Sequence, residues 1–139
     1  MIHSVKLQNF QSHKETEIEF SNGVNVIVGQ SDCGKTAILR ALRWVFTNRP
    51  SGEEFRSFWG GETSVTVTLT NGTVITRSKD KSKNLYRLND TEFTAFGQDV
   101  PQEIIQALNI NEINLQGQLD TPFLLSETPG NVAQHFNKV

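Results

Sequence analysis

Cysteine, histidine and long apolar runs are scarce in this sequence, and each shortage excludes a class of protein. The single cysteine, Cys33, cannot form an internal disulfide or a cysteine-rich zinc site, and the three histidines are scattered without ligand spacing. No apolar run approaches the roughly 18 residues of a membrane span. Charged residues such as Lys6 and Lys14 precede any segment that could serve as a signal peptide. We therefore expect a cytoplasmic protein without a membrane partner.

An excess of one sign of charge is also lacking. The sequence has 13 basic and 15 acidic residues, which leave a net charge of −2. Such a balance neither indicates nor excludes a nucleic-acid partner, since a local basic face is sufficient for that. The chain has 139 residues, without internal repeats or a linker, and we expect it to form one domain over residues 1–139.

The first third of the chain has the pattern of three strands followed by a helix. Val5 and Leu7 alternate with polar residues, and residues 17–20 do the same. Asn22-Gly23 predicts a hairpin turn into a buried strand at residues 24–28. Residues 35–46 predict a helix that is covered on most sides. Its one polar stripe consists of Thr36, Arg40, Arg43 and Thr47.

The middle of the chain predicts an antiparallel meander of three or four strands. Apolar residues alternate with threonines over residues 63–70, and the hairpin signals Asn71-Gly72 and Asn89-Asp90 follow. Residues 101–110 predict a short amphipathic helix that begins with proline. A loop leads to residues 127–139, which begin like another helix. The fold class is therefore α/β, with a mixed sheet around the first helix and an antiparallel meander beside it.

The turn between the predicted buried strand and the helix carries the chemistry. Residues 29–36, GQSDCGKT, satisfy the phosphate-loop pattern G-x-x-x-x-G-K-[ST] between a strand and a helix, as this motif requires. Its glycines allow the backbone to approach phosphates, and the N–H groups at the helix start point at them. Lys35 would neutralise phosphate charge, and the Thr36 hydroxyl would bind Mg²⁺. The alternative to a phosphate-binding loop is a structural glycine-rich turn with a lysine that faces solvent.

Two members of this loop are unusual. Asp32 would repel bound phosphates, so we expect its carboxylate to face away from them. Cys33 lies just before the helix, where the helix dipole can favour a thiolate, although it can equally be a small residue in a small space.

The opening 38 residues from Val5, with Asn9, Phe10, Ser12 and His13 ahead of the phosphate loop, resemble the N-terminal segment of the SMC-like ATPases, especially the SbcC-type double-strand-break repair proteins. The resemblance implies an ABC-type half head that binds ATP and Mg²⁺. A later segment, INLQGQLDTPFLL, resembles the Q-loop of that family, with Gln116 as the Mg²⁺ ligand and Gln118 as the alternative. The implied nucleotide-binding residues are Gly29, Gln30, Ser31, Asp32, Cys33, Gly34, Lys35, Thr36 and Ala37, together with Ser12 and His13.

The sequence departs from the family pattern at three points. Family members commonly carry arginine at the position of Gln11, and asparagine-glycine-serine where Ser31, Asp32 and Cys33 stand. The signature motif, the Walker B acid and the switch histidine of the family have no counterpart in this chain. Residues 127–139 resemble the first turns of the coiled-coil arm that leads to them.

The resemblance implies the N-terminal half of a DNA-repair ATPase, which forms a head-to-head homodimer once a C-terminal lobe is supplied. A nuclease subunit and DNA, bound without sequence specificity, are the further partners implied. Because this chain offers no convincing general base, we expect little or no ATP hydrolysis by it alone. The alternatives are a compact P-loop kinase, for which the arginines show no lid-like cluster, and a non-catalytic nucleotide-binding module.

Two further groups of residues stand out. Arg77, Lys79, Lys81 and Lys83, with Tyr86 and Arg87 nearby, predict DNA-backbone contact or simply a solvated turn. The aromatic residues Phe55, Phe58 and Trp59 are expected to close the core, with some of them exposed where a partner lobe is absent.

Overall fold

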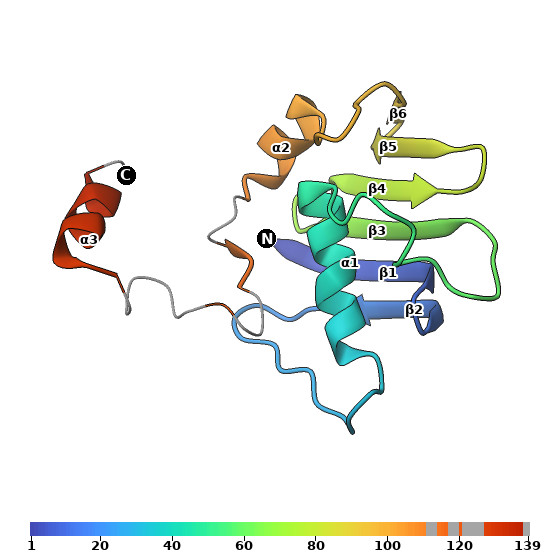
Figure 1. Ribbon diagram of the computed structural model, residues 1–139, viewed down its shortest axis with the longest axis horizontal. Helices are drawn as coiled ribbons and strands as arrows, with labels where there is room; N and C mark the ends of the chain where they lie inside the picture. Colours follow the sequence, from blue (N-terminus) through green and yellow to red (C-terminus); the bar gives the residue numbers. More distant parts are fainter. Residues whose placement is uncertain (111–113, 117–119, 121–126, 138–139) are drawn as a thin grey trace. The chain divides into compact units, whose positions relative to one another are not determined.

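The computed structural model describes residues 1–110, 114–116, 120 and 127–137, and the chain divides into one unit at residues 1–109 and a second at residues 110–139. The first unit contains a six-stranded sheet in the order β2-β1-β3-β4-β5-β6. Figure 1 shows helix α1 lying across one face of this sheet. The strands are β1 (Ile2–Phe10), β2 (His13–Glu19), β3 (Thr63–Leu69), β4 (Val74–Lys79), β5 (Asn84–Leu88) and β6 (Thr91–Phe93).

The predicted meander is confirmed as β3 to β6. Its turns contain residues that tolerate a left-handed backbone, with Gly72 at φ 84° and Asn89 at φ 50°. Every pairing in the sheet is antiparallel, and the meander extends the β1–β2 hairpin, since β1 pairs with β3. The predicted mixed sheet is therefore not present among the described residues, where one continuous antiparallel sheet takes its place.

Alternation along the strands produces the core between the sheet and α1 (Lys35–Thr47). One face of β1 and β3 buries Val5, Leu7, Val65 and Val67 completely. The helix is confirmed, and its inward face contributes Ala37, Ile38, Ala41, Leu42, Trp44 and Val45. The prediction that it is covered on most sides is wrong within the described part of the chain, because Leu39 is 56% exposed. A single sheet covers only one side of a helix.

The segment at residues 24–28 does not form the predicted buried strand. It has no strand pairing in the structure, and Val24 and Val28 are 90% and 83% exposed. A turn does precede it, where the Asn25 side chain accepts from and donates to Ser21. The apolar pattern of residues 24–28 is typical of a strand, but a strand forms only where a neighbouring strand accepts and donates its backbone hydrogen bonds. No described residue outside the segment supplies one.

An aromatic cluster joins the loop after α1 to the core. Phe55 is buried and packs on Trp44 and Phe10, with ring centroids 4.3 Å and 5.9 Å away. Phe58 is 95% exposed and Trp59 40% exposed, so of the three predicted core aromatics only Phe55 is buried. The Trp59 indole instead donates to Asn9 Oδ1 at 2.8 Å.

Two short helices complete the described elements. α2 (Gln102–Leu108) belongs to the first unit, begins after Pro101 and buries Ile104 and Leu108. In the second unit, α3 (Pro129–Phe136) begins at the predicted place, where the Thr128 side chain accepts from the Asn131 N–H. Among the described residues, the helices are too short or too polar to cross a membrane.

Tyr86 ties the sheet to the end of α1. Its side chain is fully buried on β5, and its hydroxyl lies 3.1 Å from the Trp44 carbonyl and 3.0 Å from the Val45 carbonyl. Both carbonyls belong to the last turn of α1, where the Trp44 carbonyl also accepts from the Asn48 N–H at 3.0 Å. Burial raises the pKa of Tyr86 well above its ordinary value, which keeps the phenol protonated and able to donate.

Tyr86→Phe is expected to lower the free energy of unfolding by about 1–3 kcal/mol, because the hydroxyl that donates to the end of α1 is lost while the ring packing remains. Urea denaturation followed by circular dichroism measures the change. Phe58→Leu, at a 95% exposed aromatic side chain, is the control and should shift stability by less than about 0.5 kcal/mol. Equal stability of Tyr86→Phe and the wild type would contradict this role of the hydroxyl.

Candidate phosphate-binding site

The loop at residues 29–34 leads directly into the N-terminus of α1. Gly34 is the N-cap residue, with φ 91°, and it provides no capping side chain. The first turn of the helix contains no acidic residue either. The Ala37 N–H donates to the Gly34 carbonyl at 3.0 Å, and the N–H groups ahead of it remain available to an anion, which the helix dipole also favours.

Lys35 places its positive charge over this loop. Its ammonium donates to the carbonyl oxygens of Gly29, at 2.8 Å, and Gln30, and lies 3.6 Å from Cys33 Sγ. A Cβ at Gly29 would come within 2.7 Å of that sulfur. The lysine and the glycine thus satisfy two requirements of a phosphate loop, namely a cation at its centre and a backbone without a side chain in the way.

The turn between β1 and β2 supports the loop from the side. His13 Nε2 donates to the Gly34 carbonyl at 3.0 Å, and a Cβ at Gly34 would meet His13 Nε2 at 2.7 Å and Ser12 Oγ at 2.8 Å. Because a carbonyl only accepts, Nε2 must carry a proton, which leaves Nδ1 to accept from the Thr16 hydroxyl at 2.9 Å when the ring is neutral. The structure therefore brings Ser12 and His13 to the predicted site.

Gln11, where the family commonly has arginine, lies beside α1. Its Oε1 accepts from Arg40 Nη1 at 3.3 Å, and its carbonyl accepts from the Ser57 hydroxyl at 2.7 Å. The sequence named Arg40 only as part of the polar stripe of α1 and did not name Thr16, so neither was predicted as a neighbour of the site. Arg40 was detectable in principle, because it follows Thr36 by one helical turn on the same face.

The remaining loop residues are accessible. Ser31, Asp32 and Cys33 are exposed, and Asp32 has a left-handed backbone with φ 61°. Ala37 is buried beneath the first turn of α1, where it packs into the core. Whether the Asp32 carboxylate faces away from bound phosphates stays a prediction.

The predicted Mg²⁺ ligands lie in different units of the chain. Thr36 is exposed at the second residue of α1, and Gln116 is exposed in the second unit. Gln118 lies outside the described residues. Within the described ranges there is no group of three histidine, cysteine or acidic side chains that could hold a metal. A hydroxyl, an amide and phosphate oxygens are nevertheless hard ligands of the kind Mg²⁺ prefers.

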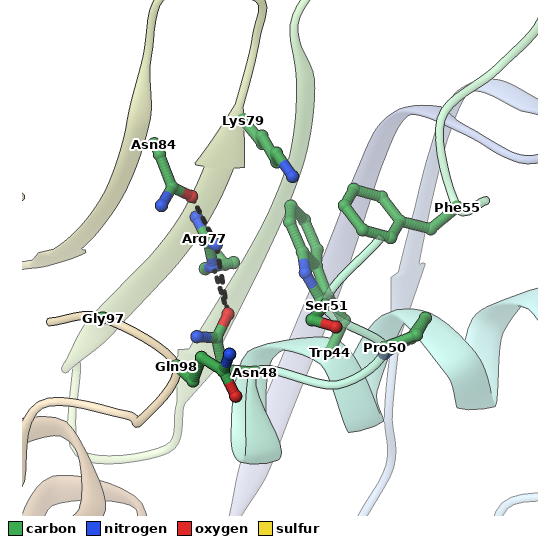
Figure 2. Close-up of a pocket in the computed structure, with 10 residues that line it drawn as sticks. All are labelled: Trp44, Asn48, Pro50, Ser51, Phe55, Arg77, Lys79, Asn84, Gly97 and Gln98. Carbon is green, nitrogen blue, oxygen red and sulfur yellow. Dashed lines mark hydrogen bonds between the residues drawn. The ribbon is translucent and has the colours of Figure 1, made fainter. Parts of the chain in front are cut away.

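Arg77 is not the surface DNA contact that the sequence predicted. Its side chain is 3% exposed, and the guanidinium lies 4.7 Å from the ring centroids of both Trp44 and Tyr86. Figure 2 shows it held between Asn48 and Asn84. Burial lowers the pKa of Arg77 below its ordinary value. Alternation along β4 places Arg77 on the face of the sheet that turns toward the end of α1.

The three lysines of the predicted patch lie at the surface. Lys81 and Lys83 are exposed in the β4–β5 turn, and Lys79 is half-buried, with its ammonium 3.3 Å from the Gly52 carbonyl. Asp80 between them pairs with Arg56 at 3.3 Å, so a cation from outside the patch offsets its charge. The basic character of the turn is therefore stronger than its sequence suggests.

A sequence profile described as the AAA domain matches residues 4–128, so the chain belongs to the AAA domain family. Among the relatives, the DNA double-strand break repair Rad50 ATPase of Methanopyrus kandleri is 52% identical over 42 residues, 30% of this chain and 5% of that protein. The Rad50 ATPase of Pyrococcus abyssi is 38% identical over 78 residues, 50% of this chain and 9% of that protein. The chain thus matches less than a tenth of either relative.

Solved structures agree on the fold. One, described as the structural biochemistry of ATP-driven dimerization and DNA-stimulated activation of SMC ATPases, matches with a TM-score of 0.71 and 21% identity over 98% of this chain and 97% of that chain. The recombination mediator RecF with ATP matches with a TM-score of 0.62 and 21% identity over 72% of this chain and 30% of that chain. The fold is that of an ABC-type ATPase head segment, and the resemblance to SMC-like Rad50 ATPases is confirmed.

Gly34→Ala is expected to weaken nucleotide binding at least about tenfold, because the new methyl group displaces Ser12 and His13 from the loop. Gly23→Ala is a matched control, since Gly23 has nearly the same φ, 92°, but nothing within 4 Å of the added Cβ. Both variants carry the same left-handed strain. Calorimetry should therefore separate them, and equal losses would contradict a role for the contacts at Gly34.

Proposed function

We propose that this chain is the ATP-binding N-terminal half of a Rad50-like or SbcC-like DNA-repair ATPase. The observation that carries the proposal is the uncapped N-terminus of α1 behind a glycine loop that holds Lys35 over its centre. The ATP phosphates would lie along residues 29–36. There Lys35 would exchange its carbonyl partners for phosphate oxygens, and His13 would keep the Gly34 carbonyl turned aside.

Mg²⁺ would be held by the Thr36 hydroxyl and, through the Q-loop resemblance, by Gln116. When bound, the ion would neutralise charge on the terminal phosphates. The side chains of this chain bind and orient the nucleotide, but none of the described ones is placed as a general base. We therefore expect turnover only after a second lobe joins this one, and two such heads would face each other across ATP.

The exposed segment at residues 24–28 supports the need for a second lobe. It carries Val24, Val26, Ile27 and Val28, which are 39–90% exposed, immediately before the phosphate loop. A second polypeptide that supplies neighbouring strands would bury these side chains and satisfy their backbone. Residues 127–139 would then begin the coiled-coil arm that connects the two lobes, and a nuclease subunit would be a further partner.

DNA is the proposed macromolecular ligand, and Lys81 and Lys83 are the candidate contacts. Both are exposed in one turn, and neither belongs to an ion pair within the described residues. Lysines in such a turn contact phosphates and not bases, so binding would not be sequence-specific.

Lys35→Ala should abolish Mg-ATP binding by the chain in a calorimetric titration, because the loop loses its only ammonium. Lys6→Ala, at an exposed ion pair with Glu15, is the control and should bind as the wild type does. Binding retained by Lys35→Ala would overturn the proposed site. Rapid hydrolysis by the chain alone would refute the need for a second lobe and favour a compact kinase-like enzyme.

Replacing both Lys81 and Lys83 with alanine should flatten the salt dependence of DNA binding by up to about two units in the slope of log K against log salt, because each lysine releases about one counterion. Fluorescence anisotropy with labelled duplex DNA across a salt series measures the slope. An unchanged slope would exclude this turn from the DNA interface.

A further inference from the structure

A pocket of about 170 Å³ lies at the C-terminal end of α1, away from the phosphate loop. Figure 2 shows its walls, which come from the end of α1, the loop after it, strands β4 and β5, and the segment at residues 97–98. The lining includes two cations, Arg77 and Lys79, and no acidic residue.

Arg77 supplies charge to this pocket but has no donor left for a ligand. Its Nε and Nη2 donate to Asn48 Oδ1 at 3.2 Å and 3.1 Å, and Nη2 also donates to Asn84 Oδ1. Nη1 donates to the carbonyls of Ser78 and Leu85 at 2.7 Å and 3.1 Å. All five guanidinium N–H groups are thus used, and every one of these acceptors is neutral. The guanidinium therefore has all of its hydrogen bonds, but none of its partners carries a negative charge.

Lys79 supplies what Arg77 lacks, namely unused donors. Its ammonium makes one long hydrogen bond, 3.3 Å to the Gly52 carbonyl, and lies 5.7 Å from the Phe55 ring centroid. An ammonium carries three N–H groups, so two remain for a ligand. The Ser51 hydroxyl also lines the pocket.

The positive charge of the pocket is not balanced by the protein. Among the residues that the structure describes, ion pairs form at Lys6, Arg56 and Arg87, and neither Arg77 nor Lys79 takes part in one. Dipoles at the end of α1 offset part of the Arg77 charge, through Asn48. A buried cation without a counter-ion is unfavourable, and an anion in the pocket would relieve it.

We propose that this pocket binds a phosphate group, with Lys79 as its direct donor and Arg77 as a fixed positive charge behind it. The turn that joins Lys79 to Asn84 carries Lys81 and Lys83, so a ligand with further phosphates would meet more positive charge outside the pocket. The source of the group is either free phosphate or the phosphate of a DNA strand. The second source rests on the proposed DNA binding, whereas the first does not.

Titration with inorganic phosphate at constant ionic strength, followed by ¹H–¹⁵N NMR of the full chain, tests the proposal. The Arg77 Nε–H and Trp44 Nε1–H signals report on the pocket, and backbone signals of residues 29–36 report on the phosphate loop. Saturable shifts of the pocket signals are expected, and they should persist in Lys35→Ala, where the loop no longer binds. Failure of the ATP site and failure of the pocket are therefore distinguishable.

Lys79→Met retains the aliphatic stem but removes the donor, and it should weaken phosphate binding at the pocket about tenfold. Lys6→Met removes one exposed charge from the face of the sheet that points away from α1, and it should leave the affinity unchanged. Shifts that do not saturate, shifts confined to residues 29–36, or wild-type affinity in Lys79→Met would each overturn the proposal.

Two DNA duplexes of the same sequence, one with and one without 5′-phosphates, separate the sources. Pocket shifts with the phosphorylated duplex alone would assign the pocket to a strand end, and shifts with both would assign it to the backbone. Shifts with inorganic phosphate but neither duplex would assign it to free phosphate.

Discussion

The packing of α1 on one face of the antiparallel sheet is the constraint on which the rest of the structure depends. The helix presents Ala37, Ala41 and Val45 to the apolar face of β1 and β3, so its position is determined by close contact along its whole length. At its far end, the Tyr86 hydroxyl and the Asn48–Arg77 interaction hold the last turn. With the C-terminus held, the N-terminus meets the glycine loop at a defined place.

The phosphate loop receives its second support from the β1–β2 turn. Phe10 anchors this turn in the core, and three residues later His13 reaches the Gly34 carbonyl. The sheet and the loop thus meet through one hydrogen bond and one glycine without space for a methyl group. The turn provides support from the side, which the loop backbone alone lacks.

Two cationic residues of strand β4 serve different purposes. Arg77 and Lys79 both occupy β4, but Arg77 is enclosed by three aromatic rings while Lys79 keeps its ammonium near the surface. Arginine suits the interior because its planar fork can satisfy all five donors with neutral oxygens. Lysine, with three donors on a flexible stem, remains available. A charge count along the sequence cannot separate these roles.

Local patterns in the sequence determined most of the elements and the glycine loop at residues 29–36, because alternation, turn residues and the spacing of GQSDCGKT act over a few neighbouring residues. The strands of the meander and helix α1 therefore agree with prediction. Tertiary structure alone decided that Arg77 is internal, that Phe58 is exposed and that residues 24–28 lack strand partners. Each of these depends on which other segments are present to cover or pair with the residue, and such long-range partners leave no mark in the local pattern.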